Sequence, residues 1–243
     1  MAKKLRLDKY LADMGLGTRS QIRDAIKKGR ASVGGETVKE PEMKVDPECD
    51  QVEFDGHAVG YVDFEYYMLY KPAGTVSATE DGRYPTVLSL IDGRNRKDLF
   101  PVGRLDLDTE GLLLFTTDGQ LAHRLLAPKH GVEKVYIARV DGILTEEDAA
   151  AFARGLQLSD FMARPARLEI LPPGDTGRVT VCEGKYHQVK RMFGARGRKV
   201  THLKRLTFGG IALDEALAPG EWRELTKAER DALYAAAEGN END

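Results

Sequence analysis

The sequence predicts an α+β protein in two parts: a small helix-helix-sheet module, then a larger domain built on a mainly antiparallel sheet. Two stretches with apolar residues at helical spacing open the chain, and two short alternating stretches follow them. From residue 66 onward, short apolar or alternating runs predominate, with helical stretches inserted between them. A chain of 243 residues is long enough for two such domains.

The module is predicted over residues 1–58. One helix is expected over 5–14, where apolar residues recur every three or four positions. A second helix follows from an N-cap at Thr18 or Ser20 and runs to Lys28. Two hairpin-like segments complete the small sheet, residues 31–38 and 50–59.

A linker at 59–64 leads to the second domain, predicted over 65–238 and followed by an acidic tail at 239–243. Asp118 and Thr145 are suited to cap two of its helices. Its strands are expected at 66–74, 111–117, 134–140, 166–171, 178–183 and 200–213. Its helices are expected at 118–126, 146–154, 186–196 and 226–237, while 86–91 fits either a short helix or a strand.

The formal net charge of −3 hides a strong segregation of charge. Residues 1–32 carry nine Lys or Arg against three Asp, and residues 185–205 carry eight Lys or Arg and no acid. Residues 214–243 carry nine acids against three bases. Two basic segments on a mildly acidic protein are typical of polyanion binding, although each taken alone also fits an ordinary solvated face.

Several classes of protein are excluded or disfavoured by the sequence. There is no apolar run of about 18 residues to span a membrane, and the basic start lacks the apolar stretch of a secretory signal. Cys49 and Cys182 are far apart and form neither a disulfide framework nor a zinc cluster, which favours a reducing cytoplasm. The five histidines lack metal-ligand spacing, so we expect no metal site, and neither a P-loop nor a dinucleotide-binding glycine motif is present.

The segment GRLDLDTEGLLLFTTDGQ (103–120) places three acids beside a strongly apolar run. An acid that faces a core is costly unless something pairs with it or uses it. Asp106 and Asp108 fit a two-carboxylate glycosidase, but the basic segments favour nucleic acid. A carboxylate that acts on a sugar–base bond in RNA reconciles both observations. It requires a nearby cation, which the acid-free helix at 186–196 can supply.

Two parts of the chain resemble known families. LRLDKYLADMGLGTRSQIRDAIKKGRASVGGETVKEP, which begins at Leu5, resembles the RNA-binding module of ribosomal small-subunit protein four, a resemblance that extends to about residue 50. YKPAG (70–74), VGRLDLDTEGLLLFTTDGQLAHRL (102–125), EKVY (133–136) and EGKYHQVKRMF (183–193) occur in the order seen in pseudouridine synthases. Together they are most similar to the bacterial branch that modifies small-subunit (16S) rRNA, with large-subunit (23S) rRNA enzymes as the alternative.

The resemblance implies a pseudouridine synthase that isomerises a flipped-out uridine of ribosomal RNA, with no cofactor, metal or energy source. It implies that Asp106 is the essential carboxylate, that Tyr136 packs against the flipped base, and that Lys190 keeps the carboxylate ionised. Arg104 matches the residue associated with holding the pocket open. Further RNA-binding residues are expected at Lys71, Lys185, His187, Gln188, Arg191, Arg19, Arg23, Lys27, Lys28 and Arg30.

Other interpretations stay open on the residues alone. Tyr136 fits a core strand aromatic, Lys190 a solvated helix lysine and Asp108 a turn cap. The whole chain also fits a non-catalytic RNA-binding factor of ribosome assembly. A carbohydrate hydrolase fits less well, because sugar-stacking aromatics are expected there and Trp222 is the only tryptophan. We expect a monomer that acts on ribosomal RNA or on a ribosomal-subunit assembly intermediate.

Overall fold

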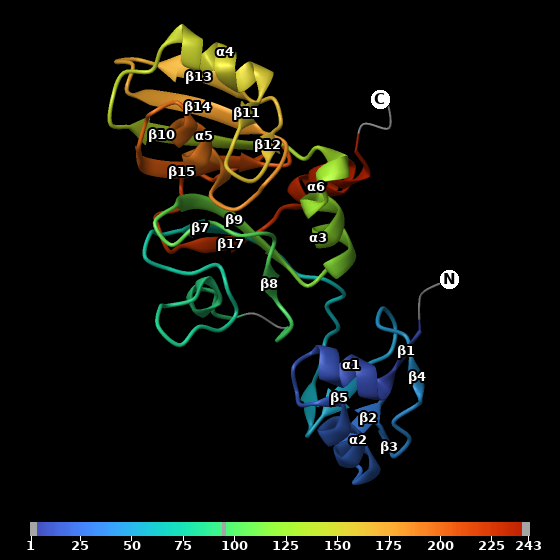
Figure 1. Ribbon diagram of the computed structural model, residues 1–243. Helices are drawn as coiled ribbons and strands as arrows, with labels where there is room; N and C mark the ends of the chain where they lie inside the picture. Colours follow the sequence, from blue (N-terminus) through green and yellow to red (C-terminus); the bar gives the residue numbers. More distant parts are fainter. Residues whose placement is uncertain (1–3, 94–95, 240–243) are drawn as a thin grey trace. The chain divides into compact units, whose positions relative to one another are not determined.

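The computed structural model describes residues 4–93 and 96–239 (Figure 1). The chain divides into two compact units, one formed by residues 1–65 and 92–99 and the other by residues 66–91 and 100–243. Both units combine helices with sheets in which antiparallel pairing predominates, so the predicted α+β class is confirmed.

The first unit packs two short helices, α1 (Leu7–Asp13) and α2 (Arg19–Lys27), on a small antiparallel sheet. Thr18 and Gln21 form a reciprocal capping box at the start of α2, which satisfies backbone N–H groups that have no partner within the helix. The sheet has the order β3-β2-β5-β6, and β1 pairs separately with β4. The strands are β1 (Leu5–Arg6), β2 (Ala31–Val33), β3 (Glu36–Val38), β4 (Lys44–Val45), β5 (Val52–Phe54) and β6 (His57–Ala58).

The segment predicted as a linker, 59–64, packs on the first unit. Val59, Tyr61 and Val62 lie against its apolar core. The Tyr10 hydroxyl also donates a hydrogen bond to the Val59 carbonyl oxygen at 2.7 Å. The apolar side chains of this stretch are therefore half-buried against the module.

Residues 92–99 also belong to the first unit, although the sequence prediction placed them in the second domain. The Arg96 guanidinium, 6% exposed, donates hydrogen bonds to the carbonyl oxygens of Val62 and Asp63. It also pairs with Asp98 at 2.7 Å. The hydrogen bonds of the buried Arg96 guanidinium thus fix its segment on the first unit, and no local sequence pattern predicts them.

In the described part of the second unit, nine strands form one sheet with the main order β13-β14-β10-β15-β9-β7-β17. β8 pairs with β9, and β16 pairs with β15. Neighbouring strands run antiparallel except β9 and β15, which are parallel. The strands are β7 (Tyr66–Lys71), β8 (Phe100–Pro101), β9 (Glu110–Thr116), β10 (Lys134–Val140), β13 (Arg167–Leu171), β14 (Thr176–Val181), β15 (Val200–Phe208), β16 (Ile211–Ala212) and β17 (Trp222–Glu224).

The parallel junction between β9 and β15 depends on Gly111. Its φ is +106°, and a Cβ atom there would lie 2.2 Å from the Arg205 carbonyl oxygen. The Arg205 side chain, 2% exposed, donates a hydrogen bond from Nε to the Leu112 carbonyl oxygen at 2.7 Å. Only glycine fits this close approach, which fixes the start of β9 against β15.

Four helices cover this sheet. α3 (Gly119–Leu126) and α6 (Lys227–Glu238) pack side by side (Figure 1) over a core that includes Met68, Leu114 and Phe208. α4 (Glu146–Arg154) and α5 (Gln188–Ala195) meet through the rings of Phe152 and Phe193, whose centroids are 4.9 Å apart. The segment 86–91 forms a single 3₁₀ turn, Val87–Leu90.

The structure corrects several predicted boundaries. The first helix begins at Leu7, because Leu5–Arg6 pairs as a strand with β4. The helix predicted over 186–196 begins at Gln188, after a left-handed residue, His187. Besides β1, five short strands among the described residues were not predicted: β4, β8, β17, β11 (Leu156–Gln157) and β12 (Met162–Ala163). Within residues 4–93 and 96–239, no helix has the length and apolar character needed to cross a membrane.

Candidate active site

The loop that carries Asp106 lies between β8 and β9 and is anchored at several points to a neighbouring loop. Ser77 Oγ donates a hydrogen bond to the Leu105 carbonyl oxygen and accepts one from the Leu105 N–H, both at 2.9 Å. The Gly74 N–H donates to the Leu107 carbonyl oxygen at 2.7 Å. These bonds bracket Asp106 on both sides, so its backbone is held in place before any substrate arrives.

Lys71 supports the same loop from within the protein. Its side chain is fully buried, and Nζ donates hydrogen bonds to the carbonyl oxygens of Thr109 at 2.8 Å and Pro72 at 3.0 Å. Burial lowers the pKa of Lys71 to about 8, and the nearby carboxylates of Asp106 and Asp108 oppose that shift. The prediction that Lys71 contacts RNA is therefore wrong, because its ammonium group is enclosed by the chain itself.

Asp106 is paired with the cation that the sequence predicted. Lys190, on α5, places Nζ 2.9 Å from Asp106 Oδ2, although the two residues are far apart in sequence. His187 Nε2 lies 3.4 Å from the other carboxylate oxygen, Oδ1. The Asp106 side chain is 25% exposed, so the carboxylate stays open to a ligand while its charge is opposed by Lys190.

Lys190 serves two carboxylates at once. Its Nζ also lies 2.5 Å from Asp108 Oδ1, and the Asp108 side chain is largely exposed. This hydrogen bond lowers the pKa of Asp108. Burial alone would lower the pKa of Lys190, but its hydrogen bonds to Asp108 and Asp106 outweigh burial and raise it. Lys190 is therefore held firmly in its charged form beside Asp106.

Tyr136 and Leu203 bring the sheet into the same site. Tyr136, on β10, and Leu203, on β15, are both largely buried and line a cleft together with Asp106. The cleft encloses about 430 Å³, including the part open to solvent, and the exposed Arg104 lines it as well. Leu206, on the same strand, is not among the residues that line the cleft. The three residues predicted to be catalytic are thus brought together from a loop, a strand and a helix.

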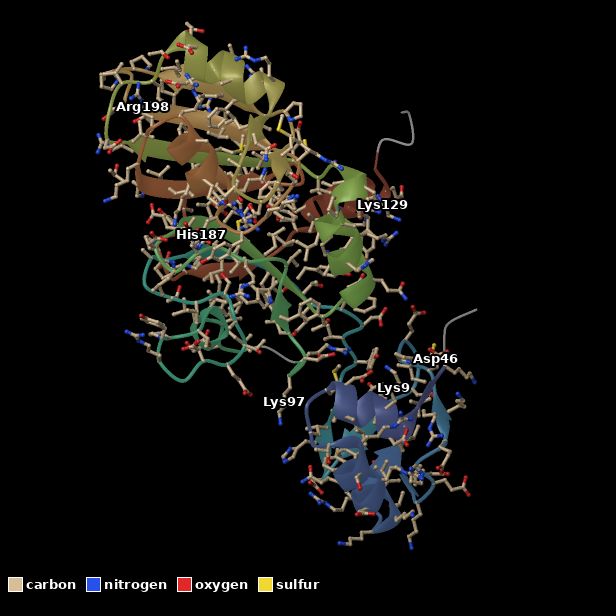
Figure 2. The ribbon with its side chains drawn as sticks, in the orientation of Figure 1. Lys9, Asp46, Lys97, Lys129, His187 and Arg198 are labelled. Carbon is tan, nitrogen blue, oxygen red and sulfur yellow. The ribbon has the colours of Figure 1, made fainter. Side chains whose placement is uncertain are left out.

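The turn before α5 forms another wall of the cleft. Gln188, 5% exposed, accepts a hydrogen bond from the Lys185 N–H at 3.0 Å and donates one from Nε2 to Glu183 Oε1 at 2.7 Å. His187, labelled in Figure 2, lies at the end of this turn among the side chains of the second unit. Gln188 thus holds the turn in shape, and its contact with RNA stays a prediction.

A hairpin that the sequence did not predict, β11–β12, packs against this turn. Its tip carries Phe161, and Lys185 Nζ lies 3.8 Å from the centroid of that ring. Arg191 also lies over Phe161 and pairs with Asp160, while donating a hydrogen bond to Ser159 Oγ at 2.9 Å. Arg191 therefore already has a carboxylate partner in the protein, and its predicted RNA contact stays a prediction.

The five basic residues predicted to bind RNA in the first unit are exposed, but three of them have acidic partners. Arg19 Nη2 lies 3.3 Å from the fully buried carboxylate of Asp8, and Arg23 Nε lies 3.9 Å from it. Burial raises the pKa of Asp8, yet hydrogen bonds from arginines outweigh this and lower it. Arg30 pairs with Asp55. The remaining two residues, Lys27 and Lys28, are exposed at the end of α2.

No group of three His, Cys, Asp or Glu side chains within the described ranges is arranged to hold a metal ion. The side chains brought together in the cleft are a carboxylate beside an ammonium group, an imidazole and a phenol. This set can act on a small polar group that enters the cleft, and the exposed Arg104 and Lys185 at its edge suit an anionic ligand.

Comparison with known proteins agrees with this arrangement. The family model described as RNA pseudouridylate synthase matches residues 65–195, and the S4 domain model matches residues 5–52. The chain is 45% identical over 231 residues to the uncharacterized RNA pseudouridine synthase YtzG of Bacillus subtilis (strain 168), covering 93% of this chain and 96% of the relative.

Two further similarities extend over nearly the whole chain. A protein of Vibrio parahaemolyticus named ribosomal small subunit pseudouridine synthase A is 44% identical over 233 residues, which cover 95% of this chain and all of the relative. A crystal structure titled as a pseudouridylate synthase matches with a TM-score of 0.67 and 40% sequence identity, covering 94% of this chain and 99% of that one. The chain belongs to the RNA pseudouridylate synthase family and carries an S4 domain ahead of its synthase domain.

Proposed function

We propose that the protein converts one uridine of small-subunit ribosomal RNA into pseudouridine, with Asp106 as the essential group. The observation that carries the proposal is the pairing of Asp106 with Lys190 at 2.9 Å inside a cleft that Tyr136 also lines. Relatives named as small-subunit pseudouridine synthases, 42–44% identical over more than nine-tenths of this chain, support the choice of RNA.

The reaction moves one bond within a single nucleotide. The bond from ribose C1′ to N1 of uracil breaks, the base turns, and C1′ bonds to C5; the hydrogen on C5 is lost and N1 regains one. The isomerisation is therefore balanced without a cofactor. A carboxylate beside the ribose can promote cleavage, and the charged Lys190 lies 2.9 Å from the carboxylate of Asp106. Attack on the sugar, attack on the base and removal of a sugar proton all fit this position.

The uridine must leave its stacked position before Asp106 can act on it. Extrusion of a base costs a few kcal/mol, which contacts elsewhere on the RNA have to offset. Tyr136 supplies a surface against which the flipped base packs. Arg104 would hold the neighbouring RNA open, a role supported by its exposure at the cleft.

The basic face of the first unit would hold RNA at a second place. Phosphate contacts from Lys27 and Lys28 would be independent of sequence and sensitive to salt. The covalent connection between the units raises the local concentration of RNA at the cleft. We further propose a monomer that acts in the cytoplasm, in keeping with two free cysteines in the described structure, Cys49 and Cys182.

The test incubates purified protein with small-subunit rRNA, large-subunit rRNA and small-subunit assembly intermediates, and then maps pseudouridine at single-nucleotide resolution. We expect one new pseudouridine in small-subunit rRNA, in free RNA or in the intermediates, and none in large-subunit rRNA. Conversion confined to large-subunit rRNA would overturn the choice of RNA. RNA binding without conversion of any uridine would favour an assembly factor over an enzyme.

A further inference from the structure

An exposed aromatic side chain lies next to the active-site cleft with no role in the reaction proposed above. Tyr186 is 75% exposed, although its two neighbours in sequence, Lys185 and His187, both line the cleft. An exposed tyrosine gives up the apolar burial that its ring could gain, so an open ring at the edge of a binding cleft suggests a ligand surface.

The Tyr186 ring is backed by a second ring that reaches the catalytic carboxylate. Tyr186 and His187 stack with centroids 3.8 Å apart and planes 18° from parallel. His187 Nε2 in turn lies 3.4 Å from Asp106 Oδ1. Since His187 covers only one face of the Tyr186 ring, the exposed surface includes the other face. The two stacked rings therefore extend from solvent to Asp106.

The turn that carries the two rings has an unfavourable backbone conformation. His187 has φ +51° and ψ 28°, the left-handed region that costs a residue other than glycine about 1 kcal/mol or more. The buried Gln188 side chain fixes the turn through the Lys185 N–H and Glu183. The fold therefore maintains a strained turn, and this turn presents the two rings.

The surroundings of the ring match the chemistry of a nucleotide. Lys185, exposed and next to Tyr186 in sequence, lines the cleft and has its Nζ 3.8 Å from the centroid of the Phe161 ring, so the same turn carries a cation and an open aromatic ring. RNA offers flat bases to stack on aromatic rings and phosphates to meet cations. A stacking surface beside a pocket for one flipped base is therefore suited to the base next to it in the strand.

We infer that Tyr186, supported by His187, stacks on the base of the nucleotide adjacent to the target uridine. This inference rests on the proposed function and deepens it. Tyr186 acts as a substrate-positioning residue: it replaces part of the stacking that the neighbouring base loses when the uridine is extruded. The target is then selected partly by the presence of a base beside it.

The test is a cycle of protein and RNA changes, read as kcat/KM for pseudouridine formation on an RNA fragment that contains the mapped uridine. The proteins are wild type, Tyr186→Ala, Tyr186→Phe and, as a matched control, Ile143→Ala, which truncates another apolar side chain that is 60% exposed and does not line the cleft. The RNAs are intact or carry an abasic nucleotide on the 5′ or the 3′ side of the uridine. Circular dichroism checks that each variant is folded.

We expect Tyr186→Ala to lower kcat/KM by about 5- to 150-fold on intact RNA, the range found for losing one base–aromatic stack. Tyr186→Phe and Ile143→Ala should stay within about threefold of wild type, because the first keeps the ring and the second lies elsewhere. Removal of the base on one side should cost wild type a similar factor and cost Tyr186→Ala little.

Two results would overturn the inference while leaving the proposed function standing. One is a wild-type enzyme that converts intact and abasic RNAs equally well. The other is a Tyr186→Ala variant that loses the same factor on every RNA, which would indicate a role unrelated to stacking. Failure of wild type to convert any rRNA uridine would instead overturn the proposed function, and the inference with it.

Discussion

Replacing Lys71 with methionine should change how the stability of the second unit depends on pH. Lys71 is fully buried and donates hydrogen bonds to the carbonyl oxygens of Thr109 and Pro72. Burial lowers its pKa from 10.5 to about 8 in the folded protein. Methionine has a similar length and no charge, so the substitution removes the titration while filling most of the same space.

The direction and size of the effect follow from proton linkage. Between pH 8 and 10.5 the folded protein has lost the Lys71 proton while the unfolded chain still binds it, so the free energy of unfolding rises with pH. For a shift from 10.5 to about 8, the rise between pH 7 and pH 9.5 amounts to about 2 kcal/mol. Tyrosines with raised pKa values act in the opposite direction at higher pH, so the comparison stops at 9.5.

The measurement is urea unfolding at pH 7, 8, 9 and 9.5, followed by the fluorescence of Trp222, which lies on β17 in the second unit. Lys134→Met is a parallel test, because burial also lowers the pKa of Lys134 to about 8 and its Nζ donates to a carbonyl oxygen at 2.7 Å. The difference in unfolding free energy between wild type and each single variant should grow by about 2 kcal/mol over this range. The double variant should differ from wild type by about twice as much.

The same substitution should also reduce catalysis. Without the ammonium group, the Thr109 carbonyl loses its donor, and the loop that carries Asp106 is held less firmly. A small displacement of a reacting group is expected to lower kcat by about 10²-fold.

The stability experiment has its own refuting result. If the difference in unfolding free energy between wild type and Lys71→Met is constant from pH 7 to 9.5, Lys71 is not a buried lysine that titrates in this range, and the reasoning is refuted.

Three further changes test other parts of the structure. Lys190→Met should lower kcat by about 10²-fold, since it removes the cation beside Asp106, the carboxylate that we propose to be essential. Lys190→Arg should recover part of that loss in steady-state assays. Gly111→Ala should lower the free energy of unfolding by about 3 kcal/mol in urea, because the new Cβ would collide with the Arg205 carbonyl oxygen and the φ of +106° is unfavourable for alanine. An unchanged urea midpoint would contradict the close approach at the parallel junction. Replacing both Lys27 and Lys28 with glutamine should reduce the slope of log Kd for the RNA against log salt concentration by about 2. An unchanged slope would show that these two lysines do not contact phosphates.

Local sequence signals predicted the elements whose stability is local. The helices that begin after Thr18, Asp118 and Thr145 were predicted, because an N-cap side chain and apolar spacing lie within a few residues of each other. The strands β4, β8 and β17 were missed, because each has two or three residues and exists only through pairing with a distant segment. The hairpin β11–β12 was missed because two residues in each strand are too few to show an alternating pattern. The packing of 92–99 on the first unit depends on Arg96 and is equally invisible in a sequence window.

In the candidate site, too, some features were predicted from the sequence and others arise only from the folded structure. An acid that faces a core requires a cation, and the acid-free helix at 186–196 was expected to supply it. The resemblance to pseudouridine synthases implied that this cation is Lys190, and the structure pairs it with Asp106. The stack of Tyr186 on His187 and the place of Phe161 against Lys185 could not be predicted, because a left-handed turn and an unpredicted hairpin create them. The sequence YKPAG also gives no sign that Lys71 is buried, and Lys71 was expected to bind RNA.

The most direct test of the central claim is pseudouridine mapping on both ribosomal RNAs from cells that lack this gene and carry either wild-type or Asp106→Asn protein. Asparagine keeps the shape of the side chain but cannot hold a negative charge, so the variant should fold and still bind RNA. We predict that one uridine of small-subunit rRNA loses its modification without the gene and regains it only with wild-type protein. Restoration by Asp106→Asn, or no change at any site in either RNA, would contradict this account.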